Sequence, residues 1–133
     1  MDLITLDFET YYDKEYSLSK LTTEEYVRDP RFEVIGIGVK VNNGPTEWAS
    51  GTHTQLEKYF AEFDWSNAMV LAHNTLFDGA ILSWRFGISP RVYTDTLCIA
   101  RALHGVEVGG SLRALSERYC IGQKGLEVND AIG

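Results

Sequence analysis

Features that mark several protein classes are missing from this sequence of 133 residues. No apolar run approaches the roughly 20 residues of a membrane-spanning helix, and Met1-Asp2-Leu3 carries neither a basic segment nor a cleavage signal. We therefore expect a cytoplasmic protein without a membrane partner. The two cysteines, Cys98 and Cys120, lack metal-binding spacing, and we interpret them as reduced, buried thiols rather than as a disulfide.

Positive charge is also scarce, because 12 Lys and Arg residues face 19 Asp and Glu residues, for a net charge of −7. Proteins that coat nucleic acid are usually basic, since neutralising phosphates supplies much of their affinity. The charge therefore argues against that class. It permits an acidic site that handles phosphates through metal ions, which then carry the positive charge. A glycine-rich phosphate loop is absent, and no Ser-His-Asp or Cys-His order is convincing.

What the sequence does contain is the apolar patterning of one folded domain, residues 1–133, with 44% hydrophobic and 12% aromatic residues. Alternation and short apolar runs predict strands at 3–8, 32–41, 46–49, 68–72 and 91–94. Helical periodicity and capping residues predict helices at 23–27, 54–63, 75–86, 95–103 and 111–119. The helix at 54–63 begins with a capping box, Thr54-x-x-Glu57.

The order of these elements predicts the fold class. The first three strands form an antiparallel meander, and the later strands alternate with helices that cross over the sheet. We therefore predict an α/β fold, a mixed sheet with parallel strands after the meander and helices on both faces. Gly36 and Gly38, inside the second strand, indicate close packing by a neighbouring group.

Two carboxylates interrupt the first predicted strand. Side chains alternate along a strand, so Asp7 and Glu9 share one face while Leu6 and Phe8 point into the opposite layer. Like charges this close need a partner, and hard oxygen ligands favour Mg²⁺ or Mn²⁺. The alternative is a half-exposed strand whose polar face happens to be acidic.

A second polar stretch, His73 to Asp78, follows a buried strand and opens a helix. Asp78 therefore lies on the first helical turn, near the sheet end where open α/β sheets place their sites. Thr75-x-x-Asp78 also has the form of a capping box, which accounts for Asp78 equally well. Helix capping explains Asp95 completely, and His73 is interpreted as a structural histidine.

Four short motifs stand in order along the chain: Asp7-Phe8-Glu9-Thr10, His73-Asn74-x-x-Phe77-Asp78, Tyr93-x-Asp95-Thr96 and Ser111-Leu112-x-x-Leu115-x-x-x-Tyr119. Their order and spacing resemble the 3′-to-5′ exonuclease domain of DNA polymerases, a member of the DEDD exonuclease superfamily with a ribonuclease H-like fold. The resemblance is nearest to phage polymerases of family A. It runs from Leu3 to about Tyr119 and is less typical over residues 10–31.

The resemblance implies a proofreading exonuclease that hydrolyses the 3′-terminal phosphodiester of single-stranded or frayed DNA with two Mg²⁺ or Mn²⁺ ions. It makes Asp7 a ligand of both ions, Glu9 a ligand of one, and Asp78 a ligand of the second. His73 and Asp95 are secondary candidates. Contacts to the substrate are implied for Thr10, Tyr11 or Tyr12, Asn74 and Phe77, and packing is the alternative for each aromatic ring.

The sequence departs from this family in one respect. The third motif of the family, Tyr-x-x-x-Asp or His-x-x-x-x-Asp on a late helix, has no counterpart here apart from His73 and Asp78, which already belong to the second motif. We expect the natural chain to continue past Gly133 with this motif, the C-terminal part of the fold and a polymerase domain. The 133-residue chain should then bind metal weakly, at one ion, and catalyse poorly. Asp95 and Asp130 are the first candidates for a third ligand within it.

Two other functional classes stay open. An exoribonuclease of the same superfamily, acting on short RNA, would use the same acids. A non-catalytic nucleic-acid-binding or assembly module would be a degenerate nuclease fold, and the retained acids argue against it. A phage-encoded protein of this kind would lie in the host cytoplasm.

Overall fold

The computed structural model describes residues 1–105 and 109–121. Its elements, in chain order, are β1 Asp2–Thr10, α1 Thr23–Arg28, β2 Val34–Val41, β3 Thr46–Ala49, α2 His53–Phe60, the 3-10 helix η1 Trp65–Asn67, β4 Ala68–Ala72, α3 Thr75–Ala80, the π-helical segment η2 Ile81–Arg85, β5 Val92–Asp95, α4 Thr96–His104 and α5 Leu112–Tyr119.

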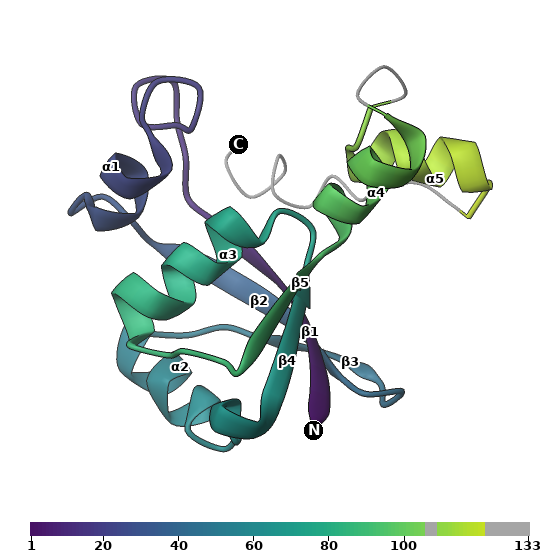
Figure 1. Ribbon diagram of the computed structural model, residues 1–133. Coiled ribbons are helices and arrows are strands. Elements are labelled where there is room, and N and C mark those ends of the chain that lie inside the picture. The colour runs from purple at the N-terminus through teal and green to yellow at the C-terminus, as the bar shows by residue number, and fades with distance from the viewer. Residues whose placement is uncertain (106–108, 122–133) are drawn as a thin grey trace.

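The strands form one open sheet with the order β3-β2-β1-β4-β5 (Figure 1). β1 pairs antiparallel with β2, and β2 pairs antiparallel with β3, whereas the β1–β4 and β4–β5 pairs are parallel. Antiparallel neighbours need only short turns, while each parallel pair needs a crossover, which α2 and α3 supply. The predicted α/β fold with a mixed sheet is confirmed.

The middle strand, β1, buries one face. Ile4, Leu6 and Phe8 are buried, whereas the residues between them are exposed or half-buried. The Phe8 ring centroid lies 6.1 Å from that of Phe60 on α2 and 6.2 Å from that of Phe86, which follows η2. The core therefore lies between this face of the sheet and the two crossover helices, as the alternation in the sequence predicts.

The first crossover helix, α2, begins two residues earlier than its capping pattern suggested. Thr52 is the N-cap; its hydroxyl accepts a hydrogen bond from the Gln55 N–H at 3.2 Å, and the Gln55 side chain accepts one from the Thr52 N–H at 2.8 Å. This reciprocal pair is a capping box, so the predicted box at Thr54 and Glu57 is wrong. Gly51, with a φ of 137°, turns the chain immediately before Thr52.

The second crossover helix changes its winding midway. Residues 75–80 are α-helical, and residues 81–85 form a π-helical segment before Gly87 ends the helix with a φ of 65°. Ile81 and Leu82 are both fully buried, and the wider turn brings these two neighbouring side chains to the core. The apolar spacing predicted the length of this helix but not its winding.

The segment between β1 and β2, residues 11–33, is called the excursion below and contains α1. Three tyrosine rings form its interior, with centroids 6.2 Å apart between Tyr11 and Tyr16 and 4.5 Å apart between Tyr16 and Tyr26. The Tyr16 hydroxyl donates to the Tyr26 carbonyl at 2.5 Å, and the Tyr26 hydroxyl donates to the Tyr11 carbonyl at 2.5 Å. Three of the tyrosines of this polar segment therefore pack against one another.

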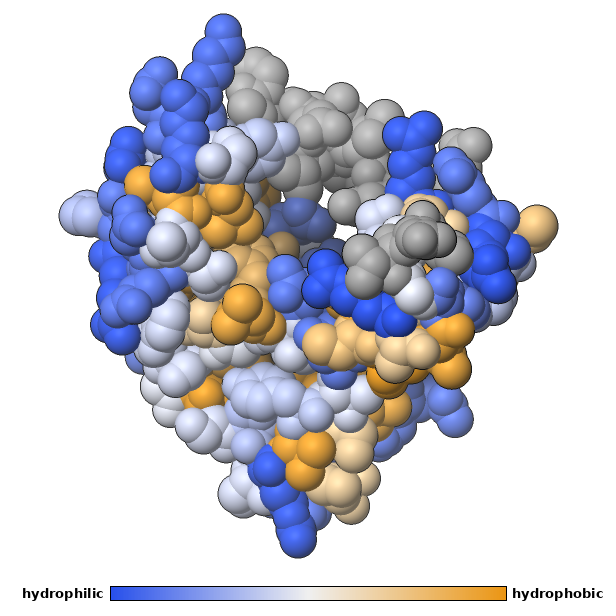
Figure 2. All heavy atoms as spheres, turned by 45° about the horizontal axis from the view of Figure 1, so that its top comes forward, coloured by the Kyte–Doolittle hydropathy of each residue, from blue (hydrophilic) through white to orange (hydrophobic). Residues whose placement is uncertain are grey.

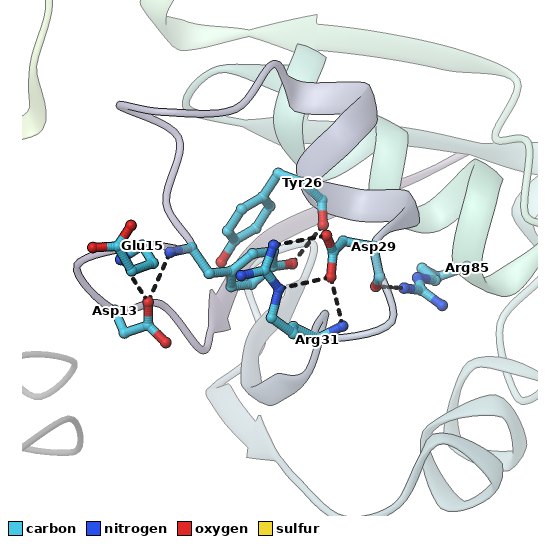
Figure 3. Close-up of polar contacts among 7 residues, drawn as sticks. Asp13, Glu15, Tyr26, Asp29, Arg31 and Arg85 are labelled. Atoms are coloured by element: carbon cyan, nitrogen blue, oxygen red, sulfur yellow. Dashed lines mark hydrogen bonds and ion pairs between the residues drawn. The ribbon is translucent and has the colours of Figure 1, made fainter.

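Arg85 fastens the excursion to η2 (Figure 3). Its guanidinium donates to the carbonyl of Asp29 at 2.6 Å and to the carbonyl of Val27, also at 2.6 Å. The Asp29 carboxylate in turn accepts two hydrogen bonds from the Arg31 guanidinium, each at 3.0 Å. These contacts hold the chain that leaves β1 against the helix that follows β4.

The last two helices, α4 and α5, lie on the opposite side of the molecule from α1 (Figure 1). Cys98 and Cys120 belong to this region; both are free, as predicted, but both are exposed. The predicted burial is wrong because Ala100 is the one buried residue that these two helices have. No helix in the described part of the chain has the length and apolar character needed to cross a bilayer.

The close packing predicted at two strand glycines is confirmed at Gly36 and wrong at Gly38. A Cβ at Gly36 would lie 2.0 Å from the Trp48 ring, whereas one at Gly38 meets nothing within 4 Å.

We predict that Gly36→Ala lowers the free energy of unfolding by about 1–3 kcal/mol because the ring must move. Gly38→Ala, the matched control, should change it by about 1 kcal/mol or less. Urea unfolding measures both, and equal losses would contradict the Trp48 contact.

Candidate active site

A groove with a volume of about 1060 Å³ lies at the carboxyl-terminal ends of β1 and β4. Figure 2 views this end of the molecule, where the surface is hollowed between the side that carries α1 and the side that carries α4 and α5. Open α/β sheets place their binding sites at this edge. Asp7, Glu9 and Asp78, the three predicted ligands, all line this groove, and their role as ligands stays a prediction.

Asp78, on the first turn of α3, is the buried acid of the site, with 3% of its surface exposed. Its Oδ1 accepts a hydrogen bond from the backbone N–H of Phe8 at 3.1 Å. The β1–β4 pairing ends at Thr5 and Leu71. Beyond that end, the Asp78 carboxylate accepts the hydrogen bond from β1 that a carbonyl of a neighbouring strand would otherwise accept. The capping-box alternative for Asp78 is wrong, because the N-cap of α3 is Asn74 and has no side-chain cap hydrogen bond.

Burial raises the pKa of the Asp78 carboxyl to about 7. The hydrogen bond from Phe8 opposes this rise, whereas the negative charges of Asp7 and Asp95 add to it. Asp7, which is exposed, and Asp78, which is buried, both line the groove, and the negative charge of Asp7 disfavours ionisation of Asp78.

Asp95, at the end of β5, joins three segments. It caps α4 by accepting from the Leu97 N–H at 2.9 Å, as predicted. It also accepts from the Asn74 N–H at 2.9 Å, the Thr75 N–H at 3.0 Å and the Thr75 hydroxyl at 3.1 Å. Burial opposes ionisation, but these hydrogen bonds outweigh it and lower the pKa of Asp95 to about 2. Asp95 is thus a clamp that fixes the turn preceding Asp78.

His73, at the end of β4, provides a second clamp. Its Nδ1 lies 2.9 Å from the Thr96 hydroxyl, and its Nε2 lies 2.5 Å from the Gly110 carbonyl. Both ring nitrogens therefore have protein partners, which supports the structural interpretation of this residue. Because Gly110 precedes α5, His73 ties the end of the sheet to the start of that helix.

Two of the predicted substrate-contacting residues lie on the groove. Asn74 lines it at the turn before α3, with a left-handed φ of 77°. Phe77 lines it as well, while its ring centroid lies 6.0 Å from that of Tyr26 in the excursion. Tyr12, the alternative to Tyr11, is also part of the lining. These side chains are placed to meet a molecule in the groove.

The other two predicted contacts lie outside the described lining of the groove. Thr10 is buried, and its hydroxyl lies 2.9 Å from that of Tyr26. The Tyr11 hydroxyl donates to the Asp13 carboxylate at 2.6 Å. Both residues therefore support the excursion, and their predicted role toward substrate stays a prediction.

The far wall of the groove comes from α4 and α5. The residues of this wall are Thr96, Leu97, Arg101, Gly110, Ser111, Leu112, Leu115, Ser116, Tyr119 and Ile121. The signal for it lay in the fourth motif, because Leu112, Leu115 and Tyr119 repeat at a spacing that places them on one helix face. That face borders the groove.

The acidic side chains of the groove are of the chemical type that binds divalent cations. Hard cations prefer carboxylate oxygens, and a buried carboxyl beside a second negative charge is stabilised by a cation. Among residues 1–105 and 109–121, no group of three or more His, Cys, Asp or Glu side chains is arranged to hold one ion together. Mg²⁺ is often held by one or two carboxylates together with water and phosphate oxygens. Asp130, named as a further candidate ligand, lies outside the described residues.

No family model matches the chain, and no curated protein sequence matches it. Solved structures do resemble it. A nuclease in its apo form has 16% identity and a TM-score of 0.64, and NrnC of Brucella melitensis has 18% and 0.60; each match covers 92% of this chain and 54% of the other. The family B DNA polymerase of Pyrobaculum calidifontis has 15% identity and a TM-score of 0.59, over 92% of this chain and 18% of the polymerase.

These matches establish the fold, which this chain shares with nucleases and with part of a polymerase. The chain spans about half the length of the nucleases named above. The structures of Brucella melitensis NrnC that match include one bound to pGG and one with bound Mg²⁺.

Stability should depend on pH through Asp78. Its pKa is about 7 in the folded chain and about 4 when unfolded, so the folded state holds the proton more tightly and loses stability as pH rises from about 4 to 7. Asp78→Asn keeps the acceptor for Phe8 and carries no charge. We predict that this variant is more stable than the unaltered chain above pH 7, by up to about 4 kcal/mol, and that the difference vanishes near pH 4.

Urea unfolding at a series of pH values measures this difference without added metal. Glu62→Gln removes one negative charge from an exposed position and serves as the control for net charge. A stability difference for Asp78→Asn that is the same at pH 5 and pH 8 would show that the carboxyl is not strained by burial.

Proposed function

We propose that this chain forms the active site of a metal-dependent 3′-to-5′ exonuclease, which hydrolyses the terminal phosphodiester of single-stranded or frayed DNA. The observation that carries the proposal is the shared groove, in which buried Asp78 feels the charge of Asp7 and Glu9 lies on the same lining. The fold shared with nucleases supports it. Burying a carboxyl costs stability, and coordination of a cation would offset that cost.

Hydrolysis of a phosphodiester needs an activated water on one side of the phosphorus and a stabilised leaving oxygen on the other. Two divalent ions, when bound, stabilise both oxygens of such an in-line displacement. In this chain Asp7, Glu9 and Asp78 would hold the Mg²⁺ or Mn²⁺. Asn74 and Phe77 would orient the terminal nucleotide, because both line the groove next to the acids.

The narrower assignment is a proofreading domain of a phage-type family A DNA polymerase, with a polymerase domain as its partner. Support comes from the motifs of the sequence and from the fold shared with part of a family B polymerase. An exoribonuclease acting on short RNA is the second candidate, which the match to NrnC bound to pGG favours. Cleavage of DNA and RNA oligonucleotides of one sequence, compared side by side, separates the two.

We predict that Asp7→Ala removes metal binding and activity together. Mn²⁺ should raise the melting temperature of the unaltered chain, because it relieves the repulsion between Asp7 and Asp78, and the variant should lose this rise. On 5′-labelled single-stranded DNA, the unaltered chain should shorten the strand slowly from its 3′ end, and Asp7→Ala should not shorten it.

Asp2→Asn is the matched control, since Asp2 is an exposed acid at the other end of the same strand. It should behave like the unaltered chain in both measurements. Full activity or an unchanged Mn²⁺ response in Asp7→Ala would rule out the proposed site.

A further inference from the structure

The wall of the groove opposite the acids has a chemistry of its own. Arg101 on α4 is the one Lys or Arg among the described lining residues. Its side chain is exposed, and the ion pairs found within the described residues involve other cations. A guanidinium that lines the same groove as the acids is a binding element for an anion that enters the groove.

The Arg101 side chain lies beside Gly110. The position that a Cβ would take at Gly110 is 3.6 Å from the Arg101 Cγ and 3.9 Å from its Nε, so the side chain runs along the Gly110 backbone. The Gly110 carbonyl is itself bonded to His73 at the end of β4. The position of the cation is therefore linked to the sheet that carries the acids.

Next to Arg101, α5 turns an apolar face to the groove. Leu112 and Tyr119, together with Ile121, line the groove and keep 39%, 51% and 76% of their surfaces exposed. The Tyr119 hydroxyl forms a hydrogen bond with His104, and the two ring centroids lie 5.5 Å apart, which orients the tyrosine. Exposed apolar side chains gathered in a groove mark a binding surface.

We propose that this α4–α5 wall binds the single strand that leads to the 3′ end, with Arg101 on a backbone phosphate and the α5 face under the bases. The inference rests on the proposed function. Aromatic and apolar faces accept any base by stacking, and a cation tracks the backbone. One cation beside an apolar strip, facing carboxylates across the groove, matches the alternation of phosphate and base along a single strand.

The test is binding of a fluorescein-labelled oligothymidylate of six nucleotides to the 133-residue chain, with phosphorothioate linkages that resist cleavage. Arg101→Ala should weaken binding roughly tenfold or more and reduce the slope of log K against log salt by about 0.7. Arg113→Ala is the matched control, because Arg113 is an exposed α5 arginine paired with Glu117 at 3.4 Å and is not part of the lining. It should leave both quantities nearly unchanged.

Substitutions at Tyr119 test the proposed binding surface independently of Arg101. Tyr119→Ala should weaken binding at least roughly fivefold through lost stacking, while Tyr119→Phe keeps the ring, loses only the hydrogen bond to His104, and should lose less affinity than Tyr119→Ala. Circular dichroism confirms that each variant is folded. Sedimentation of the same variants detects self-association through this face, and a change in oligomeric state with unchanged oligonucleotide affinity would overturn the proposal.

The outcomes separate this inference from the proposed function. If the unaltered chain binds the oligonucleotide and Arg101→Ala equals Arg113→Ala, the wall is not the strand-binding surface and the function stands. If the unaltered chain neither binds the strand nor shows Asp7-dependent cleavage, both proposals fail.

Discussion

The hydrogen bond from the Phe8 backbone to the Asp78 carboxylate is the contact on which the site depends. It joins the middle strand to the helix that follows its parallel neighbour, at the point where regular strand pairing has ended. It also brings a buried carboxyl within reach of the charge of Asp7. Without it, β1 would leave an unpaired N–H at the rim of the sheet, and the acids of the two motifs would have no fixed relation to each other.

Two sets of hydrogen bonds, made by Asp95 and His73, fix the segments around that contact. Asp95 accepts hydrogen bonds from the turn that opens α3, and His73 bonds the start of α5 through the Gly110 carbonyl. The first fixes the helix that carries Asp78; the second fixes the wall across the groove. The groove is therefore shaped by polar contacts between loops at the sheet edge, while the core beneath it is apolar. Its two walls differ in charge, which suits a substrate that alternates phosphates and bases.

The sequence predicted this arrangement where one local rule decides the outcome. The alternation of side chains along a strand placed Asp7 and Phe8 on opposite faces. The position of Asp78 shortly after a buried strand placed it at the sheet edge. Prediction failed where distant segments compete for one group. Thr75-x-x-Asp78 reads as a capping box, yet the Phe8 N–H, far away in sequence, takes the carboxylate. The spacing of Leu112 and Tyr119 places them on one helix face, but only the tertiary arrangement shows that this face borders the groove.

The most direct test of the central claim is to locate a bound cation by nuclear magnetic resonance, with Mn²⁺ as a paramagnetic probe and the chain labelled with ¹⁵N. Low concentrations of Mn²⁺ should first broaden the amide signals of residues 7–9 and 74–78, because both segments border one site. Signals near other exposed acids, such as Glu24 and Glu62, should stay sharp. Broadening centred on those acids, or broadening of one predicted segment without the other, would contradict the account of a shared metal site.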